Sequence, residues 1–158
     1  MFRPMRRAKQ QMPREECAAL LRQEKRGVLS LLGDDGYPYG VPMDYVYCPE
    51  EGRLYFHSSK QGHKADTIRT YDKASFCVVD SDRAEEGKWA LHFNSVIVFG
   101  RIRVMEDGGK IREILRGLTR RFTADETYIE DVIARSAANA MCFALEIEHI
   151  SGKRITES

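Results

Sequence analysis

Residues 57–66, HSSKQGHKAD, contain two serine hydroxyls, two imidazoles and two lysines around one glycine. A bound phosphate needs hydroxyl or amide donors and a cation, which Ser58, Ser59 and Lys64 supply. Gly62 permits close backbone approach, and Lys64 would begin a helix whose free N–H groups favour an anion. The segment therefore predicts a phosphate site, with a solvated loop as the alternative. It lacks the G-x-x-x-x-G-K-[ST] spacing of a nucleotide P-loop, which disfavours an ATPase.

His57 is the candidate catalytic residue of this segment. An imidazole titrates near neutral pH and can donate a hydrogen bond to a cofactor or substrate. The alternative is a structural role, in which His57 caps a backbone carbonyl at the end of a strand. The other histidines are expected to be structural: His92 and His149 lie in apolar strands as core or interface residues, and His63 lies in a loop.

The elements that position these residues are mostly strands. Alternating or apolar runs predict four strands, at 27–32, 37–48, 53–58 and 74–80. GDDG (33–36) and PEEG (49–52) have the composition of tight turns, so the first three strands form an antiparallel meander. Pro38 and Pro42 cannot donate to a sheet ladder, so their strand must be an edge, bulged or partly unpaired.

The second half of the chain adds helices and two more strand regions. A polar connection at 81–88 leads into an apolar run at 89–106, either one bent strand or two strands broken near Gly100. A strand at 141–155 follows. Helices are predicted from Pro13, with Cys17, Leu20 and Leu21 as the buried stripe, and at 64–71, 109–122 and 125–140. Six or seven strands joined mostly by turns predict a mainly β, α+β fold, an antiparallel barrel with appended helices.

The composition limits the function classes. The chain has 158 residues, 42% hydrophobic and 31% charged, with a formal net charge of +1. These values predict one globular domain, at 13–158, that binds no nucleic acid, and no run is long enough to span a membrane. Residues 1–12 are basic and are expected to form a flexible segment, with an arm that seeks phosphate or membrane as the alternative. Four separated cysteines without a C-x-x-C pair predict no metal site and a reducing, cytoplasmic location.

Three motifs in this order carry a family resemblance: GVLSLLGDDGYPYGVPMDYVY (27–47), GRLYFHSSKQGHKADTIR (52–69), and SVIVFG (95–100) followed by Glu106 and Asp107. Together they resemble the FMN-binding split barrel of the pyridoxamine 5'-phosphate oxidase superfamily, and more narrowly its nitroimidazole-resistance branch. The resemblance covers about residues 13–150. The R-x-x-L-L-K motif of true pyridoxamine phosphate oxidases is absent, which disfavours oxidation of vitamin B6.

The resemblance implies a cofactor site. The backbone of one strand would run beside the isoalloxazine ring, at Val41, Pro42, Met43 and Asp44. The ribityl phosphate would be held by His57, Ser58, Ser59 and Lys64. The site would be completed from the long strand, by Asn94, Ser95 and Val96. In this superfamily the flavin lies in a dimer groove, so a homodimer is expected.

The function that follows is an FMN-dependent oxidoreductase of the nitroimidazole-reductase type. It would move electrons from a nicotinamide dinucleotide to a nitroaromatic or similar small acceptor. The alternative is a non-catalytic module that binds FMN or haem, with one of the histidines as the axial ligand: His57, His63, His92 or His149. A deazaflavin-dependent reductase is a third option on the same fold.

Overall fold

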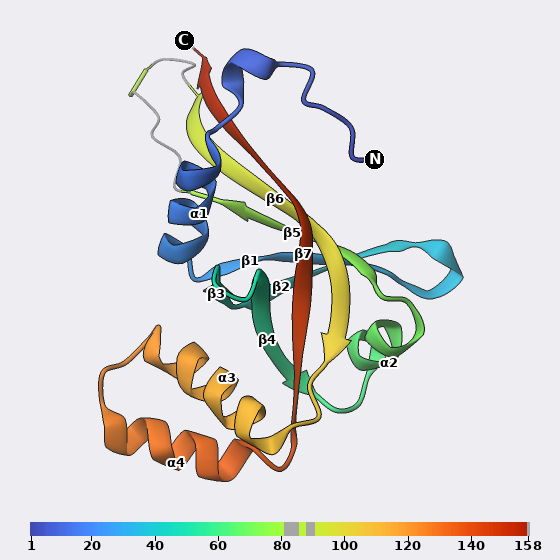
Figure 1. Cartoon of the computed structure of the whole chain (residues 1–158), viewed down its shortest axis with the longest axis vertical. Helices are drawn as coiled ribbons and strands as arrows, with labels where there is room; N and C mark the ends of the chain where they lie inside the picture. The colour runs from blue at the N-terminus through green and yellow to red at the C-terminus, as the bar shows by residue number, and fades with distance from the viewer. Residues whose placement is uncertain (81–85, 88–90, 158) are drawn as a thin grey trace.

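The computed structural model describes residues 1–80, 86–87 and 91–157. In this part of the chain one antiparallel sheet has the strand order β2-β1-β5-β6-β7-β4-β3. Its strands are β1 Arg26–Leu32, β2 Pro38–Asp44, β3 Val46–Cys48, β4 Arg53–Ser59, β5 Lys73–Val79, β6 Leu91–Val104 and β7 Ala140–Glu157. Figure 1 shows β6 and β7 running the length of a strongly curled sheet. The predicted split barrel, mainly β with appended helices, is confirmed.

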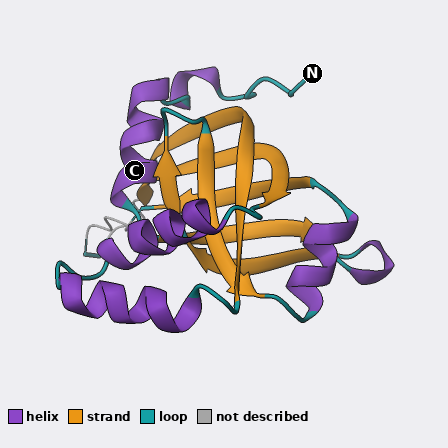
Figure 2. Cartoon of the chain, turned by 60° about the horizontal axis from the view of Figure 1, so that its bottom comes forward, coloured by secondary structure: helices purple, strands orange, loops and turns teal. Residues whose placement is uncertain are grey.

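The helices lie around the rim of the sheet (Figure 1). They are α1 Arg14–Gln23, α2 His63–Thr70, α3 Gly108–Arg120 and α4 Glu126–Ser136, with short 3-10 turns η1 Ala8–Gln10 and η2 Asp34–Gly36. Figure 2 shows α3 and α4 side by side at one end of the sheet. None of the helices in the described residues is long and apolar enough to cross a membrane.

The sheet curls because the chain passes from one edge to the other at Tyr45. The sequence predicted a single strand at 37–48, but the structure divides it into β2 and β3, which are the two edge strands. Tyr45 between them is fully buried, and its hydroxyl donates to the carbonyl oxygen of Leu21 at 2.8 Å. The edge position of β2 confirms what Pro38 and Pro42 required, since neither can donate to a second neighbouring strand.

The β1–β2 hairpin fixes the register of the strands that lead to the site. Asp35 has φ +55° and Gly36 has φ +77°, as the predicted GDDG turn demands. The hairpin is symmetric about this turn, so Arg26 lies opposite Asp44 at its open end. Their side chains form a two-point ion pair, with nitrogen–oxygen distances of 2.7 and 3.2 Å.

The two long strands β6 and β7 remain continuous through a bulge. The register shifts between Phe99 and Gly100, and a Cβ at Gly100 would lie 2.0 Å from the carbonyl oxygen of Glu146. The strand is therefore bent rather than broken, and only glycine fits at the bend. Part of the predicted polar connection and the start of this strand, at 81–85 and 88–90, lie outside the described residues.

Apolar side chains form two clusters. The barrel interior holds the larger one, around Phe56, Phe76 and Phe143. It includes the predicted α1 stripe, which is confirmed by the burial of Cys17, Leu20 and Leu21. The N-terminal segment meets this cluster at its end, where Met12 is buried and its N–H donates to the Gly152 carbonyl oxygen at 2.9 Å.

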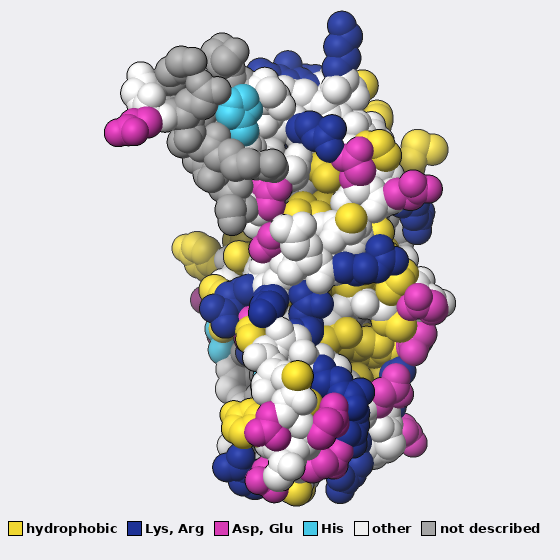
Figure 3. All heavy atoms as spheres, turned by 90° about the vertical axis from the view of Figure 1, so that its left-hand side faces the viewer, with side chains coloured by type: hydrophobic (Ala, Val, Ile, Leu, Met, Phe, Trp, Pro, Cys, Tyr) yellow, Lys and Arg dark blue, Asp and Glu magenta, His cyan; other side chains and the backbone are white. Residues whose placement is uncertain are grey.

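The second cluster joins α3 and α4 to the outer face of β4 and β7, through Ile114, Leu118, Ile129 and Ile133. On the solvent side of these helices, basic and acidic side chains are interspersed over the lower part of Figure 3. Helix α4 ends at Ser136, earlier than the predicted 140, because β7 already begins at Ala140.

Candidate functional site

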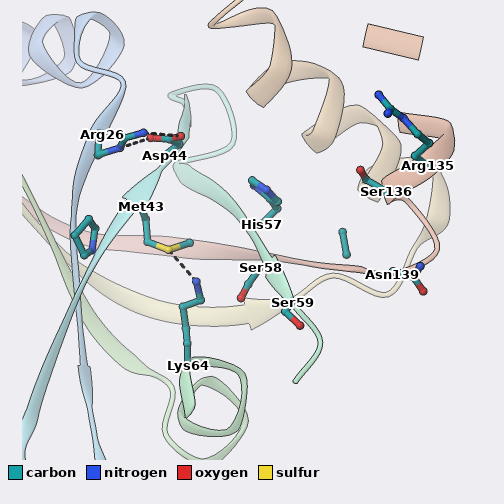
Figure 4. A pocket seen from close by; sticks show the side chains of 12 residues that line it. Arg26, Met43, Asp44, His57, Ser58, Ser59, Lys64, Arg135, Ser136 and Asn139 are labelled. Carbon is teal, nitrogen blue, oxygen red and sulfur yellow. Dashed lines mark hydrogen bonds and ion pairs between the residues drawn. The ribbon is translucent and has the colours of Figure 1, made fainter. Parts of the chain in front are cut away.

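A cavity of about 680 Å³ opens where the ends of β2 and β4 meet the start of α2 and the end of α4. From β2 it is lined by Pro42, Met43 and Asp44. From β4 and α2 it is lined by His57, Ser58, Ser59 and Lys64. Figure 4 shows Lys64 entering from α2 and Arg135 from α4, on opposite sides of the β4 serines. The structure therefore brings together the predicted β2 residues, except Val41, and all of the predicted phosphate-binding group.

The end of β4 presents hydrogen-bond donors to this cavity. Ser58 and Ser59 are the last residues of β4, and Ser59 Oγ accepts a hydrogen bond from the Gln61 amide at 3.3 Å. Gly62 follows with φ +104°, a conformation that other residues rarely adopt. It precedes α2 without any side-chain cap, so the first amides of that helix remain available to an anion.

Lys64 is a cation whose counter-charge is not found in the described part of the chain. Its ammonium donates to the thioether sulfur of Met43 at 3.3 Å, and a thioether is only a weak acceptor. No ion pair joins Lys64 to a carboxylate among the described residues, and the nearby Asp44 is paired with Arg26. Partial burial lowers the pKa of Lys64. An anion bound in the cavity would supply the missing negative charge and would raise the pKa of Lys64 again.

His57 stands in the wall of the same cavity. Surrounding protein atoms lower the pKa of His57, and the Lys64 charge lowers it further, while Asp44 acts in the opposite direction. The side chain is still exposed to the cavity, so it can reach a ligand there. With a lowered pKa, His57 is neutral at pH 7 and offers one donor and one acceptor.

Several lining residues were missed by the sequence analysis: Arg26, Arg135, Ser136, Asn139 and Ala140. A signal for Arg26 existed, because a hairpin centred on Asp35 places Arg26 opposite Asp44. The others reach the cavity through the pairing of β7 with β4, where Ala140 lies opposite Ser59. No local sequence pattern specifies that pairing.

The remaining predicted residues lie elsewhere in the chain. Val41 packs against the barrel interior. Asn94 lines a separate cavity of about 350 Å³ beside α1, and its amide side chain donates to Asp80 at 2.7 Å. Val96 is fully buried, and Ser95 precedes it on β6. Within one chain, these β6 residues do not join the cavity that holds Lys64.

The other histidines have separate surroundings. His63 was expected in a loop, which is wrong, because it is the first residue of α2. Its ring stacks on Tyr39 with centroids 4.2 Å apart. The His149 ring stacks on Phe2 at 4.6 Å. Within the described residues, no group of three or more His, Cys, Asp or Glu side chains is arranged to hold a metal ion.

Comparison with known proteins identifies the family. A family model described as pyridoxamine 5'-phosphate oxidase matches residues 13–154. The chain belongs to this family. The resemblance predicted from the three motifs is therefore confirmed. No curated protein matches the sequence.

Solved structures share the fold of this pyridoxamine 5'-phosphate oxidase family chain. A protein of Bacteroides thetaiotaomicron, provisionally described as a 5-nitroimidazole antibiotic resistance protein, has TM-score 0.80 and 18% identity, covering 92% of this chain and 87% of its own. A FAD-binding protein of Mesorhizobium loti has TM-score 0.64 and 25% identity, covering 92% and 96%. A FAD- and haem-binding protein of Mycobacterium smegmatis has TM-score 0.68 and 20% identity, covering 94% and 74%.

Proposed function

We propose that the 680 Å³ cavity binds FMN, with the phosphate held by Lys64, Ser58 and Ser59 beside the uncapped start of α2. The observation that carries the proposal is the Lys64 ammonium, which is partly buried and among the described residues has only a thioether as its acceptor. The donors around it are those that a phosphate requires. Similar structures described as FAD-binding support a flavin as the ligand.

The proposed activity is electron transfer from a nicotinamide dinucleotide to a nitroaromatic or similar small acceptor. Bound flavin supplies the two-electron chemistry, and the protein supplies position and electrostatics. The edge strand β2 offers a flat backbone surface at Pro42, which has no N–H to satisfy. Neutral His57 can donate a hydrogen bond to the flavin or the acceptor. The similarity to the Bacteroides protein supports a nitro compound as the acceptor class.

We further propose that the protein acts as a homodimer. Large apolar side chains stand exposed on the outer face of three adjacent strands: Val28, Leu32, Val79, Ile97 and Phe99. The register places Val28 beside Pro42 of the cavity on one side and beside Cys77 on the other. An apolar face of this kind marks an interaction surface. Sedimentation of the purified protein tests it, because a monomer at micromolar concentration would contradict the proposal.

The proposed location is the cytoplasm. All four cysteines of the chain are free thiols. Free thiols are typical of a reducing compartment, where nicotinamide dinucleotides are also present.

The deciding experiment is an absorption titration of the purified protein with FMN, followed by anaerobic addition of NADPH or NADH. We expect tight FMN binding, bleaching of the flavin bands by one of the two donors, and their return when a nitroimidazole is added. Failure of both donors to bleach bound flavin would reject the oxidoreductase. A Soret band without flavin binding would instead identify the haem-binding alternative.

A further inference from the structure

A second cavity of about 600 Å³ adjoins the first, between β4 and the α3–α4 pair. Asp44 and His57 line both cavities, so they form the shared wall. The far side of the second cavity is apolar and comes from the two helices and the connection between them, through Leu118, Phe122, Tyr128 and Val132.

The aromatic side chains of this cavity are accessible. The Phe122 and Tyr128 side chains are 54% and 51% exposed, so both rings can contact a ligand without rearrangement of the core. Phe122 lies in the connection after α3, and Tyr128 lies in the first turn of α4. Exposed rings at a concave site favour planar aromatic ligands, because stacked rings are stabilised beyond the area that they bury.

The charges of the second cavity differ from those of the first. Among the described residues, no lysine or arginine lines it, whereas Arg26, Lys64 and Arg135 line the first. The Lys25 ammonium lies 5.2 Å from the centre of the Phe122 ring but does not belong to the cavity lining. The N-terminus of α4 would favour an anion, but the Asp125 carboxylate already accepts the Tyr128 amide there at 3.1 Å. The charged side chains of its lining are the carboxylates of Asp125 and of Asp44, which is already paired with Arg26, so the lining offers an anionic ligand no cation.

We propose that the cavity lined by Phe122 and Tyr128 binds the second reactant, an uncharged planar aromatic ring with a polar substituent. The inference rests on the proposed function, since it names the site of the acceptor beside the flavin. The Thr123 hydroxyl, which accepts from the Asp125 amide, can donate to the substituent, and the Thr119 hydroxyl, which donates to the Leu115 carbonyl oxygen, can accept from it. The neutral imidazole of His57 faces the substituent from the shared wall. The first cavity thus selects a phosphate and the second excludes one.

Equilibrium dialysis with 4-nitrobenzamide and 4-nitrobenzoate tests the inference. The two probes have the same ring and nitro group and differ in charge. We expect the wild-type protein to prefer the amide by roughly tenfold, the order of a single uncompensated charge contact. Phe122→Ala should weaken amide binding about tenfold while FMN affinity stays unchanged. Tyr37→Ala, which removes a 73% exposed ring from the β1–β2 hairpin, is the matched control and should change neither.

Adding a positive charge to the cavity gives an independent test that does not depend on loss of binding. Thr119→Lys adds a cation to the cavity within a helix that accepts lysine well. We expect it to reverse the preference towards 4-nitrobenzoate. The inference would be overturned if wild type bound the two probes equally, or if Phe122→Ala left the affinity for 4-nitrobenzamide unchanged.

Each titration is made on both FMN-free and FMN-loaded protein. If the protein does not bind FMN but binds 4-nitrobenzamide in a way that depends on Phe122, the inferred binding site is supported and the proposed function is rejected. If the flavin is reduced and reoxidised but 4-nitrobenzamide binding is unaffected by both variants, the proposed function stands and the second cavity is rejected as the acceptor site.

Discussion

Two lysines of similar exposure show how differently this molecule treats a positive charge. Lys110, at the start of α3, donates to Glu51 at 2.8 Å and to Glu113 at 3.1 Å, and lies 5.0 Å from the centre of the Tyr55 ring. Lys64, at the start of α2, donates only to the sulfur of Met43 within the described part of the chain. Lys110 therefore has its counter-charges within the described part of the fold, whereas Lys64 does not.

Their pKa values move in opposite directions. Burial acts to lower the pKa of Lys110, but the hydrogen bonds to Glu51 and Glu113 raise it overall. Burial alone lowers the pKa of Lys64. A cation that receives its counter-charges from the chain stabilises the fold, whereas one held partly buried without them destabilises the free protein and favours an anionic ligand. This difference separates the α3 surface from the candidate site.

The largest effect is expected from Lys64→Met. This change should weaken FMN binding by about a hundredfold, because a charge-assisted contact to phosphate is lost. Riboflavin, which has no phosphate, should bind wild type and variant equally in the same fluorescence titration. The melting temperature should stay level or rise, since an uncompensated charge has been removed. A variant that binds FMN like wild type would end the distinction between the two lysines.

The next effect is expected from the double substitution Ser58→Ala and Ser59→Ala. Loss of two hydroxyl donors should weaken FMN binding about thirtyfold, with each hydrogen bond contributing on the order of 1 kcal/mol. Thr156→Ala, which removes an exposed hydroxyl from β7, is the control. If the serine variant loses riboflavin affinity to the same degree, the hydroxyls do not contact the phosphate.

Lys110→Met should show the reverse of Lys64→Met. Removing its ion pairs is expected to lower the free energy of unfolding by about 1 kcal/mol, as for partly exposed pairs. FMN affinity should not change. Chemical denaturation measures the first quantity and the fluorescence titration the second. A loss of FMN affinity here would show that the α3 surface and the site are coupled.

The smallest effect concerns His57 and pH. Its folded pKa lies below the ordinary 6.5, so between these two values the unfolded chain binds one more proton. Stability from this group is therefore present above pH 6.5 and is lost as pH falls through the folded pKa. His57→Gln should flatten the dependence of the melting temperature on pH in that window. A wild-type protein that gains stability on acidification there would contradict the environment assigned to His57.

The sequence predicted the part of the site that is formed by local structure. The phosphate-binding group lies within one strand–turn–helix segment, residues 57–64, and the prolines marked β2 as an edge. The hairpin turn at Asp35 also sets the position of Arg26 opposite Asp44. Periodicity and turn residues act over short distances in the chain, and these features depend on nothing else.

The sequence did not predict the part that depends on long-range pairing. Arg135 and Asn139 reach the cavity only because β7 pairs with β4, and the predicted strand is divided at Tyr45 because its two halves pair at opposite edges of the sheet. Asn94 was assigned to the same site on the family resemblance, yet within one chain it lines a different cavity. If Asn94 contacts the flavin, it does so from the second copy, across the interface of the proposed dimer.

An NMR titration of the lysine side chains shows whether Lys64 holds the phosphate, when it is made on the free protein and on protein saturated with FMN or riboflavin. We expect the pKa of Lys64 to lie below 10.5 in the free protein, to rise when FMN binds and to stay unchanged with riboflavin, while the pKa of Lys110 does not respond. If FMN leaves the pKa of Lys64 unchanged, this cation has no part in holding the phosphate.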